Sequence, residues 1–318
     1  KRVVESRKTN LELLLSNHVG DCRPPCALAC PAGTDCQGYV GLIANGEYEK
    51  ALELVKDKIP LPAAIGRVCP HPCEKCRRSL VDEPISIANL KRFVADRDLK
   101  GGNSYIPDIK ADTNKSVAII GGGPMGLSSA YFLRQKGHDV TIIESMPRLG
   151  GMLRYGIPEY RLPKAVLDEE IKLIESMGVK MITNTKVGVD VSFEKIRREY
   201  DAVLLGIGAW VSTGVRCKGE DSQGVIGGID FLRKVVRNEE IDLGKNVAIV
   251  GGGNTAMDAC RTAVRLGAKK VYNIYRRTKN EMPADMVEIT EAEEEGVIFK
   301  NLTNPIEVVA DESGRVKE

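Results

Sequence analysis

The feature that most constrains this chain is a glycine-rich segment at residues 116–145, SVAIIGGGPMGLSSAYFLRQKGHDVTIIES. A short apolar run precedes glycines at G-x-G-x-x-G spacing, an apolar-periodic stretch follows them, and a second apolar run leads to an acid. This pattern is typical of a βαβ unit in which the glycines let the backbone approach a pyrophosphate and the acid accepts a bond from a ribose hydroxyl. We therefore predict a dinucleotide site formed by Gly121, Gly123, Pro124, Gly126 and Glu144.

The same pattern recurs 130 residues later, in NVAIVGGGNTAMDACRTAVRLGAKKVYNIYRR at residues 246–277. The second strand of this unit ends in Arg276 and Arg277, where the first unit has an acid. Arginines suit a ribose 2′-phosphate, so the first site fits FAD and the second fits NADP(H). The alternative for the two arginines is a solvated strand end. The G-x-G-x-x-A loop of this second site comprises Gly251, Gly253, Asn254, Thr255 and Ala256.

Seven of the nine cysteines lie between positions 22 and 76. In a reducing compartment such a cluster more often binds metal than forms disulfides. Pro24 and Pro25 interrupt the first group, which predicts a loop wrapped around a metal centre in place of a continuous helix. A proline directly follows one cysteine of each group, a pattern known from two-cluster iron–sulfur proteins. The predicted ligands are Cys22, Cys26, Cys30, Cys69, Cys73 and Cys76, completed by His18 and Cys36 into two [4Fe–4S] clusters.

Three alternative interpretations of the same residues, each of them structural, remain open. Four of the cysteines suffice for a structural zinc site, although zinc usually takes paired C-x2-C knuckles. His18 could cap a helix, and Cys36 could be a small buried apolar residue.

The overall composition places limits on function and location. The 318 residues carry a net charge of +2, which gives no sign of a nucleic-acid partner. No apolar run approaches the ~18 residues of a membrane span, and the first ten residues lack the apolar core of a signal peptide. We expect a cytoplasmic protein.

The predicted architecture is α/β, with a helical iron–sulfur domain at residues 1–112, the N-terminal part of an FAD-binding domain at 113–244 and a truncated NAD(P)H-binding domain at 245–318. The run 101–115 reads as a linker. Helices are predicted at 11–16, 37–45, 48–57, 87–97 and 162–177 from apolar periodicity. Short strands are predicted at 179–183 and 186–191, and a buried strand at 201–208 that passes close to a bound ligand.

Several motifs together resemble a known flavoprotein group across roughly residues 15–318: CALACP, IGRVCPHPCE, GGGPMGLSSA, GGMLRYGIPEYRLP, GGGNTAMD, and YRR with the later MPA. The chain is similar to the small (beta) subunit of bacterial glutamate synthase. It also resembles the amino-terminal half of dihydropyrimidine dehydrogenase and the NADPH-binding subunit of the bifurcating ferredoxin:NADP transhydrogenase.

This resemblance implies two [4Fe–4S] clusters, FAD on the first glycine loop and NADP(H) on the second. It also implies that Arg161, and Gly151 of GGMLRY, lie at the flavin site. Hydride would pass directly from the nicotinamide to the flavin, so no side chain is assigned as catalytic. Electrons would then leave through the clusters to a partner subunit.

Three departures from the family pattern bear on the ligand set. His18 stands where the family usually has a cysteine, and Lys91 stands where the dehydrogenase relative has a glutamine ligand. We expect Cys36 to fill that gap. The residues around His18 also resemble the junction after the [2Fe–2S] ferredoxin domain of complex I and iron-only hydrogenase subunits, where a histidine ligates a cluster.

The late Gly-Asp segment with which the family returns to its FAD domain has no counterpart here, so the chain reads as a fragment cut at both ends. The competing function is a zinc-stabilised, non-catalytic nucleotide-binding scaffold of a larger complex. Cys217 and Cys260 are isolated in the sequence, which argues against a dithiol of the thioredoxin-reductase kind.

Overall fold

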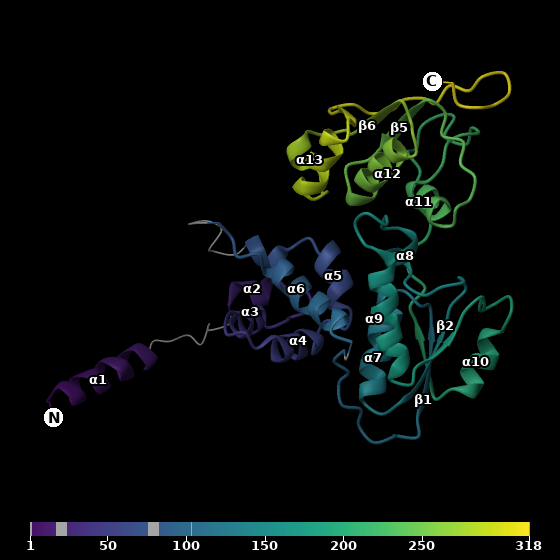
Figure 1. The fold of residues 1–318 in the computed structure, drawn as a ribbon. Coiled ribbons are helices and arrows are strands. Elements are labelled where there is room, and N and C mark those ends of the chain that lie inside the picture. Colours follow the sequence, from purple (N-terminus) through teal and green to yellow (C-terminus); the bar gives the residue numbers. More distant parts are fainter. Residues whose placement is uncertain (1, 17–23, 76–82, 103, 318) are drawn as a thin grey trace.

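The computed structural model describes residues 2–16, 24–75, 83–102 and 104–317, coloured along the chain in Figure 1. His18, Cys22 and Cys76 therefore lie outside the described residues. The helical N-terminal region comprises α1 (Arg2–Ser16), α2 (Pro25–Ala29), α3 (Cys36–Ala44), α4 (Tyr48–Lys56), α5 (Pro62–Val68), the 3-10 helix η1 (Pro72–Lys75) and α6 (Ile87–Lys100). The helices expected at 37–45, 48–57 and 87–97 correspond to α3, α4 and α6.

Helix α1 projects away from the rest of the molecule and has no buried residue (Figure 1). It is longer than the helix expected at 11–16. The other helices of this region enclose a small apolar core, in which Tyr39, Leu52 and Val55 are buried.

The loop expected around the first cysteine group is wrong for residues 25–29. Pro25 occupies the first turn of α2, and Pro24 precedes it with extended backbone angles. A proline costs nothing at the start of a helix, because the N–H that it lacks has no partner inside the helix. The two prolines therefore begin a short helix here, which contradicts the expected loop at residues 25–29 but not the expectation that they preclude one continuous helix across the cysteine group.

The first nucleotide-binding unit contains a parallel sheet of order β3-β2-β1-β4. Its strands are β1 (Ser116–Ile120), β2 (Asp139–Ile143), β3 (Lys180–Ile182) and β4 (Ala202–Leu205). Its helices are α7 (Pro124–Gln135), α8 (Met152–Tyr155), α9 (Lys164–Ser176) and α10 (Phe193–Glu199). Apolar side chains of β1, β2, α7 and α9 form its main core, and the predicted βαβ unit at 116–145 corresponds to β1-α7-β2.

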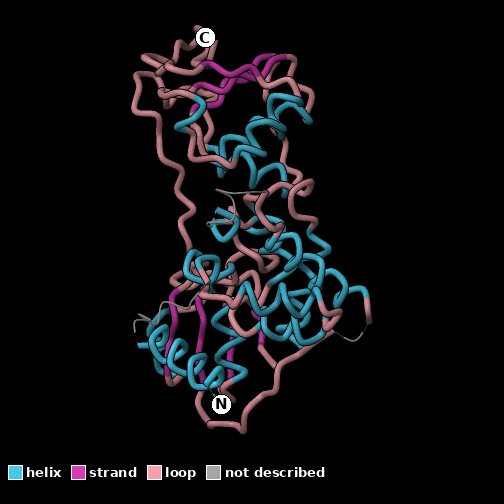
Figure 2. Tube along the Cα trace, turned by 90° about the vertical axis from the view of Figure 1, so that its left-hand side faces the viewer, coloured by secondary structure: helices cyan, strands magenta, loops and turns pink. Residues whose placement is uncertain are grey.

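The second nucleotide-binding unit contains a parallel sheet of order β5-β6-β7. It comprises α11 (Gly228–Val236), β5 (Asn246–Val250), α12 (Asn254–Arg265), β6 (Lys270–Ile274), the 3-10 helix η3 (Lys279–Glu281), α13 (Met286–Glu294) and β7 (Ile298–Lys300). Its apolar core shares no residue with that of the first unit. Figure 2 shows the strands gathered in two groups at opposite ends of the molecule.

Two strand predictions need correction. Residues 186–191 form a turn closed by a single bridge between Val187 and Val191, because Gly188 adopts a φ of +89° that reverses the chain. The strand expected to be buried at 201–208 is the shorter β4, which is at an edge of the sheet and leaves Leu205 and Ile207 exposed. Within the described residues no helix combines the length and the apolar character needed to cross a membrane.

Candidate cofactor-binding sites

The first glycine loop joins β1 to α7 and has no room for side chains at two of its glycines. Gly121 has a φ of +109°, and a Cβ added to it would lie 2.3 Å from the Gly206 carbonyl oxygen at the end of β4. A Cβ on Gly126 would lie 1.9 Å from the Gly121 carbonyl oxygen. The glycines therefore let loop, helix and strand end approach closely, as a dinucleotide-binding turn requires.

Glu144, directly after β2, is bonded to this loop. Its Oε2 accepts the Gly122 N–H at 2.6 Å, and its Oε1 accepts the Met146 N–H at 2.7 Å and the Ser145 hydroxyl at 3.1 Å. The side chain is buried. These bonds hold a carboxylate beside the N-terminus of α7, where a ribose hydroxyl of a bound dinucleotide can donate to it.

The GGMLRY segment lies against the same loop. The Gly150 N–H donates to the Gly122 carbonyl oxygen at 2.8 Å, and a Cβ on Gly151 would lie 2.7 Å from the Gly123 Cα. Asp168 of α9 forms ion pairs with Arg154 of this segment and with Arg148, which lies just before it. The structure thus brings Gly151 together with Gly121, Gly123, Pro124, Gly126 and Glu144, which fits FAD at this position.

The second glycine loop, between β5 and α12, is covered by residues 282–285. The Ala284 N–H donates to the Gly252 carbonyl oxygen at 3.0 Å, and the Asp285 N–H donates to Asn254 Oδ1 at 2.9 Å. The Asn254 side chain is therefore bonded to the backbone of the segment that covers the loop. At Gly253, at the start of α12, an added Cβ would meet no atom within 4 Å, so this edge of the loop is open.

The residue that directly follows the second strand of the βαβ unit is an acid in the first unit and a tyrosine in the second unit. A Cβ on Gly252 would lie 2.5 Å from Tyr275 Cε2, so the ring occupies the space beside the loop. Arg276 and Arg277 follow it and are exposed. No ion pair is seen for either arginine among the described side chains, so both are available to an anion at this strand end.

Asn273 was not anticipated from the sequence. It is fully buried on β6, and its Nδ2 donates to the Gly251 carbonyl oxygen at 2.8 Å. This bond joins β6 to the second glycine loop and stabilises the position of the loop. The signal that could have revealed it is an amide side chain inside the strand KVYNI, where burial requires a hydrogen-bond partner.

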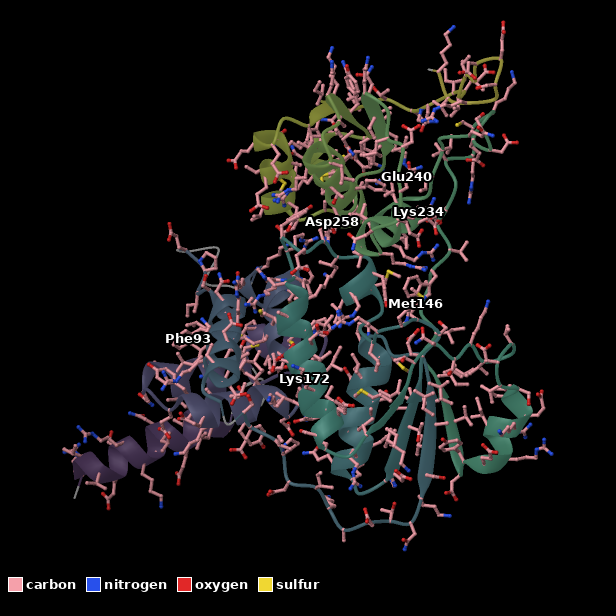
Figure 3. The ribbon with its side chains drawn as sticks, turned by 45° about the vertical axis from the view of Figure 1, so that its right-hand side comes forward. Phe93, Met146, Lys172, Lys234, Glu240 and Asp258 are labelled. Carbon is pink, nitrogen blue, oxygen red and sulfur yellow. The ribbon has the colours of Figure 1, made fainter. Side chains whose placement is uncertain are left out.

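Arg161, expected at the flavin site, forms its ion pairs with residues of the second unit. Its Nη1 lies 3.0 and 2.9 Å from the two carboxylate oxygens of Asp258 on α12, and its Nε lies 2.8 Å from Glu288 Oε1 on α13. Burial raises the pKa of Asp258 to about 6, opposed by the charge of Arg161. Figure 3 shows Asp258 at the boundary between the two units.

The described cysteines of the N-terminal region come from two segments that pack together through α2 and η1. Cys36 and Cys73 are buried. The Cys36 thiol donates to the Cys26 carbonyl oxygen at 3.7 Å and is hydrogen-bonded to Cys73. The hydrogen bond from Cys36 is the main cause that lowers the pKa of Cys73 to about 7; the positive charge of the buried Lys91 acts in the same direction, and burial opposes both. Soft thiols brought together from two segments fit an iron–sulfur centre.

Among the described residues no three Cys, His, Asp or Glu side chains are grouped closely enough to hold a metal ion. Cys26, Cys30 and Cys69 are half-buried at the ends of α2 and α5. The role of each predicted ligand stays a prediction, and those for His18, Cys22 and Cys76 fall outside the described residues.

Comparison with known proteins agrees with this geometry. Residues 111–317 match the family model described as pyridine nucleotide-disulphide oxidoreductase, and residues 16–103 match dihydropyrimidine dehydrogenase domain II, 4Fe-4S cluster. The chain belongs to the pyridine nucleotide-disulphide oxidoreductase family. It combines an N-terminal region that matches an iron–sulfur domain with a Rossmann-like nucleotide-binding region.

Curated relatives of this chain include three named subunits or chains of larger enzymes. The beta subunit of NADP(+)-dependent formate dehydrogenase from Moorella thermoacetica is 45% identical, with 92% of this chain and 45% of the relative covered. The beta subunit of NADPH-Fe(3+) oxidoreductase from Geobacter sulfurreducens is 43% identical, with 92% and 44% covered. The small chain of glutamate synthase from Escherichia coli is 36% identical, with 92% and 65% covered. The chain spans about half the length of the first two relatives.

Two solved structures superpose on this chain and share its fold. FprA from Mycobacterium tuberculosis superposes with a TM-score of 0.56 at 20% identity, over 64% of this chain and 62% of FprA. 2-Naphthoyl-CoA reductase superposes with a TM-score of 0.55 at 17% identity, over 78% and 37%. The predicted α/β architecture and the predicted resemblance to the glutamate synthase small-subunit group are both confirmed.

Proposed function

We propose that this chain oxidises NADPH and passes the electrons through FAD and two [4Fe–4S] clusters to a partner subunit. The observation that carries the proposal is the difference between the two strand ends. In the first unit the Glu144 carboxylate is fixed beside the glycine loop. In the second, Tyr275 packs on the loop and two exposed arginines follow it.

This difference supports FAD in the first unit and NADPH in the second. A carboxylate accepts bonds from the ribose hydroxyls of FAD and repels a 2′-phosphate, whereas Arg276 and Arg277 attract one. Gly253 leaves the α12 N-terminus open to a pyrophosphate. A bound flavin accepts a hydride and releases single electrons, and the protein supplies position and electrostatics.

The iron–sulfur assignment rests on the hydrogen bonds among the described cysteines and on the domain family that the N-terminal region matches. The proposed ligands are Cys22, Cys26, Cys30, Cys36, Cys69, Cys73 and Cys76, with His18 as the eighth. The buried Cys36 adjoins Cys73 and Cys26, which supports its inclusion. Lys91 is buried beside Cys73 and would stabilise thiolate charge without ligating.

The proposed domains are residues 1–112, 113–244 and 245–318, but Phe231 and Leu232 of α11 pack in the apolar core of the second unit, so α11 lies with the third of these domains. Formate dehydrogenase, NADPH-Fe(3+) oxidoreductase and glutamate synthase each contain a relative of this chain as a named subunit or chain. A partner subunit that receives the electrons is therefore part of the proposal.

One preparation separates this function from the zinc-stabilised scaffold. The full-length protein is purified without oxygen, and its iron, acid-labile sulfide, zinc and released flavin are measured per chain. About eight irons and one FAD are expected. A content of about four irons per chain would mean that only one cluster is present. His18, Cys36 or both would then not be cluster ligands. Zinc without iron, and no NADPH oxidation, would favour the scaffold.

A further inference from the structure

The two nucleotide-binding units have separate apolar cores and meet at a shared boundary. Their apolar cores share no residue, and a cavity of about 340 Å³ lies between them, lined by residues 156–164, α11 and the end of α12. Helix α11 packs against α8 at this boundary. A few buried polar contacts must therefore contribute strongly to the relative orientation of the units.

Those contacts converge on two adjacent residues of the first unit, Tyr160 and Arg161. The Tyr160 ring lies under two guanidinium groups of α12, with Arg261 at 4.5 Å and Arg265 at 3.9 Å from its centroid. Arg161 pairs with Asp258 on α12 and Glu288 on α13. Its side chain is only 10% exposed.

The two carboxylates that pair with Arg161 have further contacts, or are buried, so that their own positions are restricted. Glu288 lies 2.8 Å from Arg161 through Oε1 and 2.8 Å from Arg261 through Oε2. Asp258 is buried, and both of its oxygens face Arg161. Removing one partner from such a buried pair is costly, because the remaining charge is left without compensation.

We propose that Asp258 and Glu288 are positioning residues for hydride transfer: by holding Arg161 they fix the second unit, and the nucleotide on it, in one orientation relative to the first. This inference rests on the proposed function. Hydride transfer requires reacting atoms roughly 3–3.5 Å apart, and a displacement of about 1 Å can cost about 100-fold in rate. The orientation of the units therefore sets the rate, while nucleotide affinity is set locally by the second loop.

The test uses the full-length holoprotein with Asp258→Asn and Glu288→Gln together, which remove the charges and keep the shapes. The matched control is Glu291→Gln, since Glu291 pairs with Arg261 and, among the described side chains, forms no ion pair with Arg161. Asp258→Glu is the conservative variant that restores the charge. Genetically encoded labels at the exposed positions Lys172 and Glu240 (Figure 3) report the distance between the units without any requirement for activity.

The double variant is expected to broaden the label distance, slow flavin reduction by NADPH roughly tenfold or more and leave the NADPH Kd within about twofold. Glu291→Gln should change none of these, and Asp258→Glu should recover much of the rate. An unchanged distance, or a broadened distance with an unchanged flavin-reduction rate, would overturn the positioning role. So would an equal effect of Glu291→Gln. If the unaltered protein does not oxidise NADPH, the proposed function fails, while the label distance still decides whether these carboxylates set the orientation.

Discussion

The Glu144 carboxylate accepts the backbone N–H of Gly122 at 2.6 Å, which ties the end of β2 to the first glycine loop. The acid therefore shapes the loop, in addition to its proposed role as an acceptor for a ribose hydroxyl. Its second oxygen is bonded to residues 145 and 146 and holds the turn after the strand. Loop geometry and ligand recognition thus depend on the same side chain.

We expect Glu144→Ala to weaken FAD binding by one to two decades. Hydrogen bonds to a charged group contribute about 1.5–3 kcal/mol each, and 1.4 kcal/mol corresponds to a factor of ten. Glu144→Gln keeps one acceptor oxygen and should lose less. Flavin titration of the apoprotein, followed by fluorescence, measures both. Equal FAD affinity in Glu144→Ala and the unaltered protein would contradict the assignment.

The glycines of the two loops should respond differently to alanine. Gly126→Ala places a Cβ 1.9 Å from the Gly121 carbonyl oxygen, so it should destabilise the fold by about 1–3 kcal/mol. Gly253→Ala meets no protein atom, so it should leave Tm unchanged and weaken NADPH binding, because its methyl group would occupy the space of the pyrophosphate.

Gly41→Ala on α3 is the matched control, since it is also free of contacts and lies far along the chain from either loop. Calorimetry and nucleotide titration distinguish the three variants. Normal NADPH binding by Gly253→Ala would place the nucleotide elsewhere.

Replacing Arg276 and Arg277 with Ala should reduce the preference for NADPH over NADH by one or more decades for each arginine. Each contact between a guanidinium and a phosphate contributes about 1.5–3 kcal/mol, and NADH lacks the 2′-phosphate. Lys270→Ala, at the opposite end of β6, is the control cation. Kd values for both nucleotides decide the outcome, and equal losses for NADPH and NADH would mean that the arginines are structural.

Glu170 should give the stability of the protein a pH dependence of its own. This buried residue of α9 accepts the N–H groups of Ala63 and Ala64 at 2.6 and 2.9 Å, which joins the first unit to α5. Burial raises its pKa from 4.5 to about 7, although the two N–H groups oppose the rise. The folded protein therefore keeps a proton that the unfolded chain releases above pH 4.5. This contribution to stability is lost as the pH rises through about 7.

In the Glu170→Gln variant we expect Tm to vary less between pH 5.5 and 7.5 than in the unaltered protein. Glu169→Gln, which changes the exposed neighbour, should retain the original profile. Calorimetry at matched ionic strength measures all three. Parallel Tm profiles for Glu170→Gln and the unaltered protein would show that Glu170 does not titrate in this range.

Local patterns in the sequence predicted the two βαβ units, because apolar runs, glycine spacing and the residue after the second strand are local signals with a direct physical meaning. They also identified the family, since several specific motifs occur in one order. The same signals singled out Gly121 and Gly126 at the first glycine loop and Glu144 after the second strand, and the structure shows why no larger residue fits at Gly121 and Gly126.

Which side chains meet across the two units became visible only in the folded chain. Asp258 and Glu288 lie 97 and 127 residues from Arg161 along the chain, and no local pattern encodes such a pairing. The same holds for Asn273 under the second loop and for Glu170 at the start of α5. Burial gives these polar groups their importance, because a buried charge or amide needs a partner, and packing of the whole chain decides which partner is near.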